Sequence, residues 1–581
     1  MILFDLNFTL ANSNYLQCDC YIDDLSTCGN GITFRFPTWV PGSYLIRDFS
    51  RFISGISVES NGQPLNFSQE DKTTWSIEPC NNPVKISYKI YLFDTSPRSG
   101  YLDEARLFFD GCRVFIQVDN MLEAEHQLSI CAWKEDDKVY TTMLQKTVDN
   151  SGFGLYTAKN YWDLIEHPFA VGDFQCIEFK VNKVPHSCVI MDADIAFDQD
   201  RLRNDVVKAC EGQVKFWKSM PIDRYIFFLG VEPQGYGGIE HTYSSSLLCS
   251  YNQLPYRTTK KENKEYISLL GLFSHEYLHV WNVKRLRPEV FVKPDLSGPV
   301  YTEQLWIFEG ITSYYDDLNL MRAGIIEKKK YLELLENNFN RLLINYGRCE
   351  QSLAESSFDA WTKFYQPDEN SVNAITSYYL KGSIVALMLD LKIISETQGK
   401  YSLQDVMLSA WQKYYVERDG LPEAAFEELA EQVTGLDLKN FFNTMIRSTQ
   451  DLDYKYELEK FGIEFNIAKD NKKAAEYLGV VLKPGPEVII KNIINSSPAR
   501  DSGLCPNDEI ISVNGYRAKN KTINTMLANI ADDSNAELLI ARQGKVIKKD
   551  LSVMPSSGLK RCKLKNIEEN KLQNTWLKVY G

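Results

Sequence analysis

The sequence predicts a multidomain α+β protein with three units. At 581 residues the chain is too long for a single hydrophobic core. Up to about residue 180, apolar and polar side chains alternate as they do in half-buried strands, whereas residues 196–460 repeat apolar side chains with helical spacing. From about residue 465 a turn, a short helix and a strand follow one another closely, which indicates a third, smaller unit.

The first unit, residues 1–190, is expected to be an antiparallel β-sandwich. Residues 84–90 (VKISYKI) alternate apolar side chains with Lys or Ser, which is typical of a strand with one buried face. Residues 113–118 and 177–184 look similar, and turn signals such as Asn61-Gly62 separate these runs. The pattern does not by itself distinguish a sandwich from a barrel.

The second unit, residues 191–462, is expected to be mostly helical with some sheet. Residues 198–220 have helical periodicity, and residues 224–233 (RYIFFLGVEP) read as one buried strand. Further helices are predicted at 327–346, 381–393 and 425–435. This unit is large enough for a catalytic domain.

Composition narrows the function classes. The formal charge of −13 argues against a nucleic-acid-binding surface, and the apolar stretch 382–394 is interrupted by Asp390 and Lys392, so no membrane span is expected. The thirteen cysteines are scattered apart from Cys18 and Cys20, and no signal-peptide pattern opens the chain. We therefore expect reduced thiols in a cytoplasmic enzyme, although a chain trimmed of a signal peptide would look the same.

A metal-binding pattern lies in residues 272–288 (LFSHEYLHVWNVKRLRP). His275 and His279 are two of only six histidines in the chain, and their spacing of four places both imidazoles on one helix face. Glu276 between them is placed to hold a water on the ion rather than to bind the ion. This is the H-E-x-x-H pattern of zinc hydrolases, and it requires a third ligand.

The third ligand is expected to be a carboxylate from a later helix. The pattern that adds a third histidine fails, because Asn282 and Arg285 stand where it needs Gly and His. The downstream candidates are Glu289, Glu303, Glu309, Asp316 and Asp317.

Among these acids Glu309 is the strongest candidate. It is the only charge between Leu305 and Ser313, and a buried acid is costly unless it is paired or bound to metal. The alternative is an ion pair with one of three basic residues, Lys284, Arg285 or Arg287.

The third unit, residues 463–556, resembles a PDZ domain, with residues 557–581 as a C-terminal extension. Pro498-Ala499, Gly503-Leu504 and Asn514-Gly515 follow the central PDZ signature, and Asn507 replaces the usual turn glycine. The resemblance implies a carboxylate-binding loop at Tyr477, Leu478, Gly479 and Val480, which would receive peptide C-termini. The alternative is a structural appendage that binds nothing.

The segments HEYLHVWNVKRLRP (275–288) and LWIFEGITSYY (305–315) together resemble the glycyl aminopeptidase family, gluzincin metallopeptidases related to aminopeptidase N that often carry a PDZ domain. The resemblance extends to WVPGSYLIRDFSRF (39–52), GGIEH (237–241), YLKG (379–382) and GLDLKNFFNTMI (435–446). It implies a thermolysin-like catalytic domain with one Zn²⁺ per chain, held by His275, His279 and Glu309. Glu276 would act as the general base, and Tyr379 would stabilise the oxyanion, with the adjacent Tyr378 as the alternative.

The resemblance also implies aminopeptidase action on peptides with a free N-terminus and a small first residue, Gly or Ala. Glu240 would bind the substrate's α-ammonium, and Gly237 and Gly238 would let the substrate backbone approach. His241 has three candidate roles, namely substrate contact, support of the site, or packing.

Two questions stay open at this stage. The basic run at 284–287 forms a solvated face, pairs with Asp316 or Asp317, or reaches a peptide carboxylate. Asp316 is also the expected partner of a metal-bound imidazole.

The competing functions are a zinc endopeptidase with PDZ-directed recruitment, and a non-catalytic peptide-binding scaffold.

Overall fold

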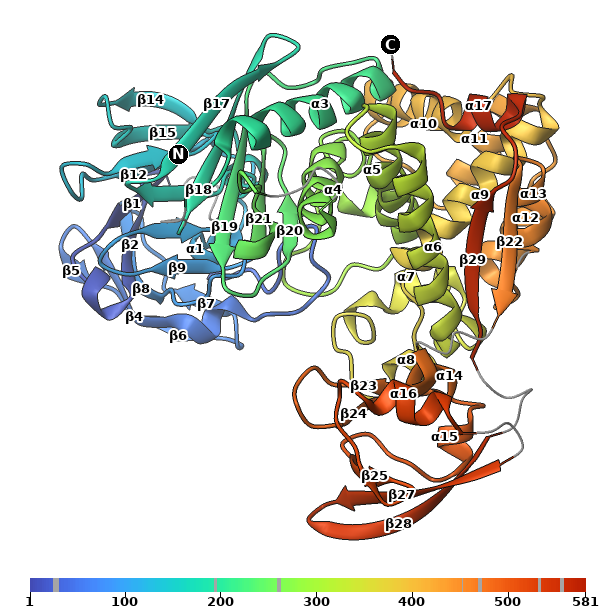
Figure 1. Ribbon diagram of the computed structural model, residues 1–581. Coiled ribbons are helices and arrows are strands. Elements are labelled where there is room, and N and C mark those ends of the chain that lie inside the picture. The colour runs from blue at the N-terminus through green and yellow to red at the C-terminus, as the bar shows by residue number, and fades with distance from the viewer. Residues whose placement is uncertain are drawn as a thin grey trace.

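The structure, a computed structural model, describes residues 1–24, 31–192, 196–258, 263–451, 453–468, 473–530, 534–553 and 559–580. Figure 1 shows a β-rich N-terminal unit in blue and cyan, a central unit that carries most of the helices, and a smaller orange and red unit. The predicted multidomain α+β class is confirmed.

The elements of the N-terminal unit are β1 (Ile2–Asn7), η1 (Ala11–Ser13), β2 (Tyr15–Ile22), β3 (Ile32–Arg35), η2 (Phe49–Phe52), β4 (Ile53–Ser60), β5 (Gln63–Pro64), β6 (Phe67–Gln69), β7 (Thr74–Ile77), β8 (Val84–Tyr91), β9 (Gly100–Leu102), β10 (Leu107–Phe109), α1 (Gly111–Val114), β11 (Gln117–Val118), β12 (His126–Ile130), β13 (Lys138–Tyr140), β14 (Leu144–Val148), β15 (Gly154–Ala158), α2 (Tyr161–Leu164) and β16 (Phe169–Gly172).

Three sheets form this unit. The largest has the order β14-β15-β12-β1-β2-β8-β4-β5, and two smaller sheets have the orders β13-β16-β10-β9 and β11-β3-β7-β6. Strand β8 buries every second residue as predicted, and Tyr88 on it contacts Phe36 just after β3, with ring centroids 5.3 Å apart. Among the described residues the end strands β14 and β5 do not pair with each other, so the unit is layered rather than a closed barrel. The β1–β12 pair is parallel, unlike its antiparallel neighbours.

The prediction of a strand at 113–118 is wrong for the first half of this segment. Residues 111–114 form α1, and Asp110 caps this helix by accepting a hydrogen bond from the Cys112 amide at 2.9 Å. Every residue from 111 to 118 is buried. Apolar residues in such a fully enclosed run do not indicate a strand with one solvated face.

The hairpin β17 (Gln175–Val181) and β18 (Val184–Met191) belongs to the central unit. Strand β18 pairs in parallel with β19 (Tyr225–Glu232), within a sheet of order β17-β18-β19-β21-β20. The predicted run 177–184 therefore includes the turn, where Asn182 and Lys183 have positive φ angles. We propose a domain boundary near residue 174 in place of the expected 190.

The remaining elements of the central unit are α3 (Gln199–Trp217), β20 (Gly237–Glu240), β21 (Ser244–Ser250), η3 (Tyr251–Gln253), α4 (Lys264–Leu278), η4 (Glu289–Phe291), the π-helical turn η5 (Trp306–Gly310), α5 (Ile311–Arg322), α6 (Lys328–Ile344), η6 (Tyr346–Cys349), α7 (Leu353–Phe358), η7 (Asp359–Trp361), α8 (Ser371–Ala374), α9 (Leu380–Glu396), α10 (Leu403–Trp411), the π-helical turn η8 (Gln412–Val416), α11 (Ala425–Thr434), α12 (Lys439–Arg447) and α13 (Tyr454–Glu459). The helices predicted at 198–220, 327–346, 381–393 and 425–435 and the strand predicted at 224–233 are all present.

The C-terminal part returns to the central unit. Strands β22 (Ile463–Ala468) and β29 (Arg561–Asn566) pair with each other, and their apolar residues belong to the large core rather than to the PDZ core. Helix α17 (Lys571–Trp576) also docks there, because the indole N–H of Trp576 donates to Tyr314 Oη at 2.9 Å. The PDZ unit is therefore inserted between β22 and β29, where a PDZ start at 463 and a separate extension from 557 were expected.

The PDZ unit contains α14 (Ala474–Tyr477), β23 (Val480–Leu482), β24 (Ile490–Ile493), α15 (Pro498–Asp501), β25 (Glu509–Val513), β26 (Tyr516–Arg517), α16 (Ile523–Ala528), β27 (Ser534–Arg542) and β28 (Lys545–Val553). Asn507 has a φ of 69°, as expected for a residue in the place of a turn glycine. Asn514 and Gly515, with φ of 51° and 79°, form the turn between β25 and β26.

Two predictions from composition can be compared with the structure. The described cysteines are all free thiols, while Cys28 lies outside the described residues. Among the described helices, none combines the length and the apolar character needed to cross a bilayer.

Candidate active site

Helix α4 carries the histidine pair. Asn263 caps its start by accepting from the Tyr266 amide at 2.7 Å, and His279 ends it as the C-cap residue. The spacing of four brings the two imidazoles together as predicted, with ring centroids 4.7 Å apart.

Glu309 completes a three-residue cluster. It lies in the π-helical turn η5, and its Oε2 is 3.4 Å from Nε2 of both His275 and His279. π-Helical turns are rare and are frequent at functional sites. Among the described residues Oε2 is buried without a hydrogen-bond partner. Burial raises the pKa of Glu309, but the two histidines hold it at about 2. The alternative pairing of Glu309 with the basic run is not observed, because those residues have other partners.

The Nδ1 atom of each imidazole lies within hydrogen-bond distance of an oxygen atom on the side away from Glu309. Nδ1 of His275 lies 3.0 Å from Oδ2 of Asp316, and Nδ1 of His279 lies 2.7 Å from the carbonyl oxygen of Asn282. Both Nε2 atoms therefore face Glu309, and these three donor atoms lie within 4.8 Å of one another. An orphaned carboxylate oxygen beside two oriented imidazoles fits a metal ion. The predicted partnership of Asp316 with an imidazole is present.

Glu276 and Gly238 are in close contact. A Cβ atom added to Gly238 would lie 2.1 Å from Oε1 of Glu276, so only glycine leaves room for this carboxylate. Burial raises the pKa of Glu276 to about 7. Gly238 was expected to make room for a substrate backbone, and the structure gives it this additional role.

Glu240 is the last residue of β20, the edge strand of the five-stranded sheet. It points to the same side as Glu276 and His279, and one donor atom from each lies within 4.8 Å of the others. Gly42, with a φ of +99°, lies against Glu240, since a Cβ there would be 2.5 Å from Oε1. The Pro41-Gly42 pair is a turn signal in the sequence, but its contact with a residue two hundred positions away could not be inferred from it.

His241 packs away from the site. Its Nε2 lies 2.9 Å from Oδ2 of Asp110 in the N-terminal unit, it is buried, and it does not line the cleft. Of the three roles considered, packing between units is the one that its contacts support, and direct substrate contact is not.

The basic run also serves packing. Nζ of Lys284 lies 2.6 Å from Glu166, which also accepts from the amide and hydroxyl of Thr242. Arg285 donates to the carbonyl of Val280 at 2.8 Å. Arg287 pairs with Asp419 at 3.2 Å. The run is therefore neither a brace on Asp316 or Asp317 nor, for Lys284 and Arg285, a solvated face.

The two tyrosines of the YLKG segment differ. Tyr379 lines the cleft, its ring centroid lies 6.2 Å from that of His275, and its hydroxyl is 3.3 Å from that of Tyr365. Tyr378 has no exposed surface and does not line the cleft. Tyr365, which the sequence did not single out, adds a second hydroxyl beside that of Tyr379.

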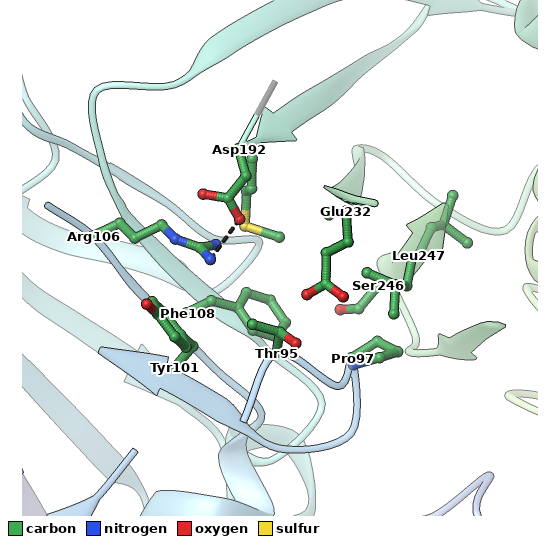
Figure 2. Close-up of a pocket in the computed structure, with 12 residues that line it drawn as sticks. Thr95, Pro97, Tyr101, Arg106, Phe108, Asp192, Glu232, Ser246 and Leu247 are labelled. Atoms are coloured by element: carbon green, nitrogen blue, oxygen red, sulfur yellow. Dashed lines mark ion pairs between the residues drawn. The ribbon is translucent and has the colours of Figure 1, made fainter. Parts of the chain in front are cut away.

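Apart from His241, the residues expected at the catalytic site line one large cleft. It has a volume of about 870 Å³ and is lined by residues of β20, α4, η5, α5, α6 and the start of α9. Another hollow, between the N-terminal unit and the five-stranded sheet (Figure 2), has a volume of about 10 Å³, which is the space of one water molecule. The cleft is therefore the candidate active site.

Two amides of the expected PDZ carboxylate-binding loop already have hydrogen-bond partners in this structure. Tyr477 and Leu478 are buried, the Leu478 amide donates to the carbonyl of Ala474 at 3.0 Å, and the Gly479 amide donates to that of Glu476 at 2.9 Å. These two amides are therefore already used within the turn that ends α14.

Comparison with known proteins gives three domain matches. The family model described as M61 glycyl aminopeptidase matches residues 268–385, the Peptidase M61 N-terminal domain matches residues 4–173, and the PDZ domain matches residues 452–547. The structure of an aminopeptidase N family protein from Idiomarina loihiensis covers 100% of both chains at 31% identity, with a TM-score of 0.94. No curated protein matches the chain.

A more distant likeness is to an M1 zinc metallopeptidase from Deinococcus radiodurans. It covers 78% of this chain and 94% of that protein at 11% identity, with a TM-score of 0.48, which is too weak to bear on the site. From the family models and the full-length match, the chain is a metallopeptidase that carries a PDZ domain. It belongs to the M61 glycyl aminopeptidase family.

Proposed function

We propose that this protein is a zinc aminopeptidase that removes one N-terminal residue from peptides. The observation that carries the proposal is the position of Glu240, a buried carboxylate beside Glu276 and His279 that is not needed in the three-residue metal cluster. A peptide's α-ammonium bound there would leave its first carbonyl beside the metal cluster. A free N-terminus is thereby required.

The donor set supports zinc. Two ligand atoms each about 2.05 Å from a tetrahedral ion are about 3.3 Å apart. The two separations from Glu309 Oε2 to the imidazole nitrogens are 3.4 Å. One Zn²⁺ per chain on His275, His279 and Glu309 would polarise the scissile carbonyl and lower the pKa of water.

The protein groups supply the remaining chemistry. Glu276 takes a proton from the attacking water and delivers it to the leaving amine, and Gly238 leaves room for its carboxylate. The hydroxyl of Tyr379 donates to the oxyanion, and the lining position of Tyr379 favours it over Tyr378. Asp316 fixes the orientation of His275.

The size of the first residue is a separate proposal. Selection of Gly or Ala follows from the family resemblance. A pocket of about 80 Å³ opens beside Glu240, and we propose that a first side chain projects into it. Its lining includes the aromatic residues Trp39, Tyr44 and Trp162 and the charged residues Glu166, Lys284 and Arg287. Comparing kcat/KM for peptides that begin with Gly, Ala, Leu and Phe measures this preference directly.

Peptide binding is the general expectation for the PDZ unit, and capture of a C-terminus at its groove is the finer proposal. A carboxylate at Leu478 and Gly479 requires their amides to leave the carbonyls of Ala474 and Glu476. Titration of the protein with one peptide as its free acid and as its amide tests this proposal. Equal affinities would leave the loop without a role in binding.

Glu276→Gln tests the catalytic proposal against a binding scaffold. We expect kcat to fall by about 10²- to 10⁴-fold with zinc content unchanged, since general-base catalysis typically contributes that much. Unchanged hydrolysis would remove Glu276 from the mechanism. Absence of hydrolysis in the zinc-loaded wild type, over a peptide panel, would favour the scaffold.

A further inference from the structure

Arg98 is a cation in the cleft that the proposed chemistry does not use. It comes from the loop between β8 and β9 of the N-terminal unit and lines the cleft together with Glu240 and Glu276. Its Nη2 donates to the carbonyl oxygen of Gly238, and its Nε is buried without a hydrogen-bond partner. Within the described residues, no carboxylate forms an ion pair with it.

The loop that carries Arg98 is held in place. The side chain of Asp94 accepts from the Ser96 amide at 2.9 Å, and the Ser99 amide donates to the carbonyl of Ser96 at 3.1 Å. Figure 2 shows Pro97 beside Leu247 of the five-stranded sheet, and the hollow left there is only about 10 Å³. Arg98 is therefore presented by a docked loop.

The position of Arg98 along β20 defines which part of a peptide it meets. Glu240 and Gly238 are two residues apart on an edge strand, which is about 7 Å along the chain. Consider a substrate that runs antiparallel to β20 and binds Glu240 through its ammonium group. The end of its second residue would then lie beside Gly238. Arg98, bonded to the Gly238 carbonyl, stands where the free carboxylate of a peptide of two or three residues would lie.

Arg98 supplies a positive charge on a cleft wall that also carries Glu240 and Glu276. Burial, and after it the positive charge of Arg98, lower the pKa of Arg47. Arg561, another cation of the cleft wall, is paired with Glu476 of the PDZ unit. A substrate carboxylate beside Arg98 would accept charge-assisted hydrogen bonds from its guanidinium group, which is paired with no carboxylate among the described residues.

We propose that Arg98 binds the C-terminal carboxylate of the substrate, so that the enzyme selects di- and tripeptides by both of their charged ends. This inference rests on the proposed aminopeptidase function, because Glu240 defines the direction of the substrate. The bond from Arg98 to Gly238 also occupies the edge strand where a longer peptide would continue.

The test is a set of alanine peptides of two to five residues, each as free acid and as C-terminal amide, with the zinc-loaded full-length protein. For wild type we expect kcat/KM of the di- or tripeptide acid to exceed that of its amide by about 10- to 100-fold, since hydrogen bonds to a charged group are worth that much. The ratio should fall to about one at five residues. In Arg98→Gln the ratio should be about one at every length.

Arg341→Gln is the matched control, because Arg341 also lines the cleft, on α6 away from β20. Its acid-to-amide ratio should equal that of wild type, and loss of the ratio in this variant instead of Arg98→Gln would overturn the proposal. A wild-type ratio of one would also overturn it. N-acetylated peptides run in parallel keep the two proposals distinct, since their cleavage contradicts the role of Glu240 whatever the acid-to-amide ratio is.

Discussion

Replacing Gly238 by alanine perturbs Glu276, the proposed general base, without touching a proposed metal ligand. The new Cβ would lie 2.1 Å from Oε1 of Glu276 and 2.5 Å from its Cδ, closer than the 3.0 Å below which such contacts essentially do not occur. The carboxylate must therefore move by about 1 Å, and a misplacement of that size costs roughly 100-fold in rate. We expect kcat of Gly238→Ala to fall by about that factor.

The assay measures kcat and KM on an alanine dipeptide together with zinc per chain and the melting temperature. Gly271→Ala is the control, because its Cβ in α4 would meet nothing closer than Oδ1 of Asp317 at 3.4 Å, an ordinary contact. It should keep wild-type kcat and gain about 0.5–1 kcal/mol in helix stability. If Gly238→Ala kept kcat within about threefold and zinc in full, the position of Glu276 would not limit the reaction.

Three further predictions follow from the site and the core. Glu309→Ala should lose most of its zinc in a metal assay, and full retention would point to another carboxylate. Tyr379→Phe should lower kcat by about 10²-fold with zinc retained, as removal of an oxyanion donor does, whereas Tyr378→Phe should change it little; the reverse result would exchange their roles. Burial lowers the pKa of His126 to about 4, below its unfolded value of about 6.5, so the unfolded state takes up the proton first and stability falls as pH drops from about 6.5 toward 4. At pH 5 this group should destabilise the fold by about 2 kcal/mol relative to pH 7, and His126→Phe should make the melting temperature less sensitive to acid; an unchanged pH dependence would refute the assignment.

The sequence predicted features that depend on local spacing. The pair His275 and His279 met because four residues make about one helical turn, and Glu309 was identified because a lone acid among apolar residues is costly. Asn507 adopts the left-handed conformation that its place in the PDZ signature requires.

Contacts between distant segments could not be read from the chain. A solvated face is one of the three alternatives that the sequence leaves open for the basic run after His279, but Lys284 is buried against Glu166 of the N-terminal unit. Likewise, nothing local to Gly42 or Arg98 shows that they reach β20. The sequence also did not predict that β29 returns to the central unit, because β29 and its partner β22 are separated in sequence by the whole PDZ unit.

The most direct test of the proposed function compares one alanine peptide with its N-acetylated form on the zinc-loaded protein. Acetylation removes the positive charge that Glu240 is proposed to bind and leaves a buried carboxylate unpaired. We expect the acetylated peptide to be cleaved at least about 100-fold more slowly in kcat/KM. Equal cleavage of the two peptides would contradict the aminopeptidase assignment and favour an endopeptidase.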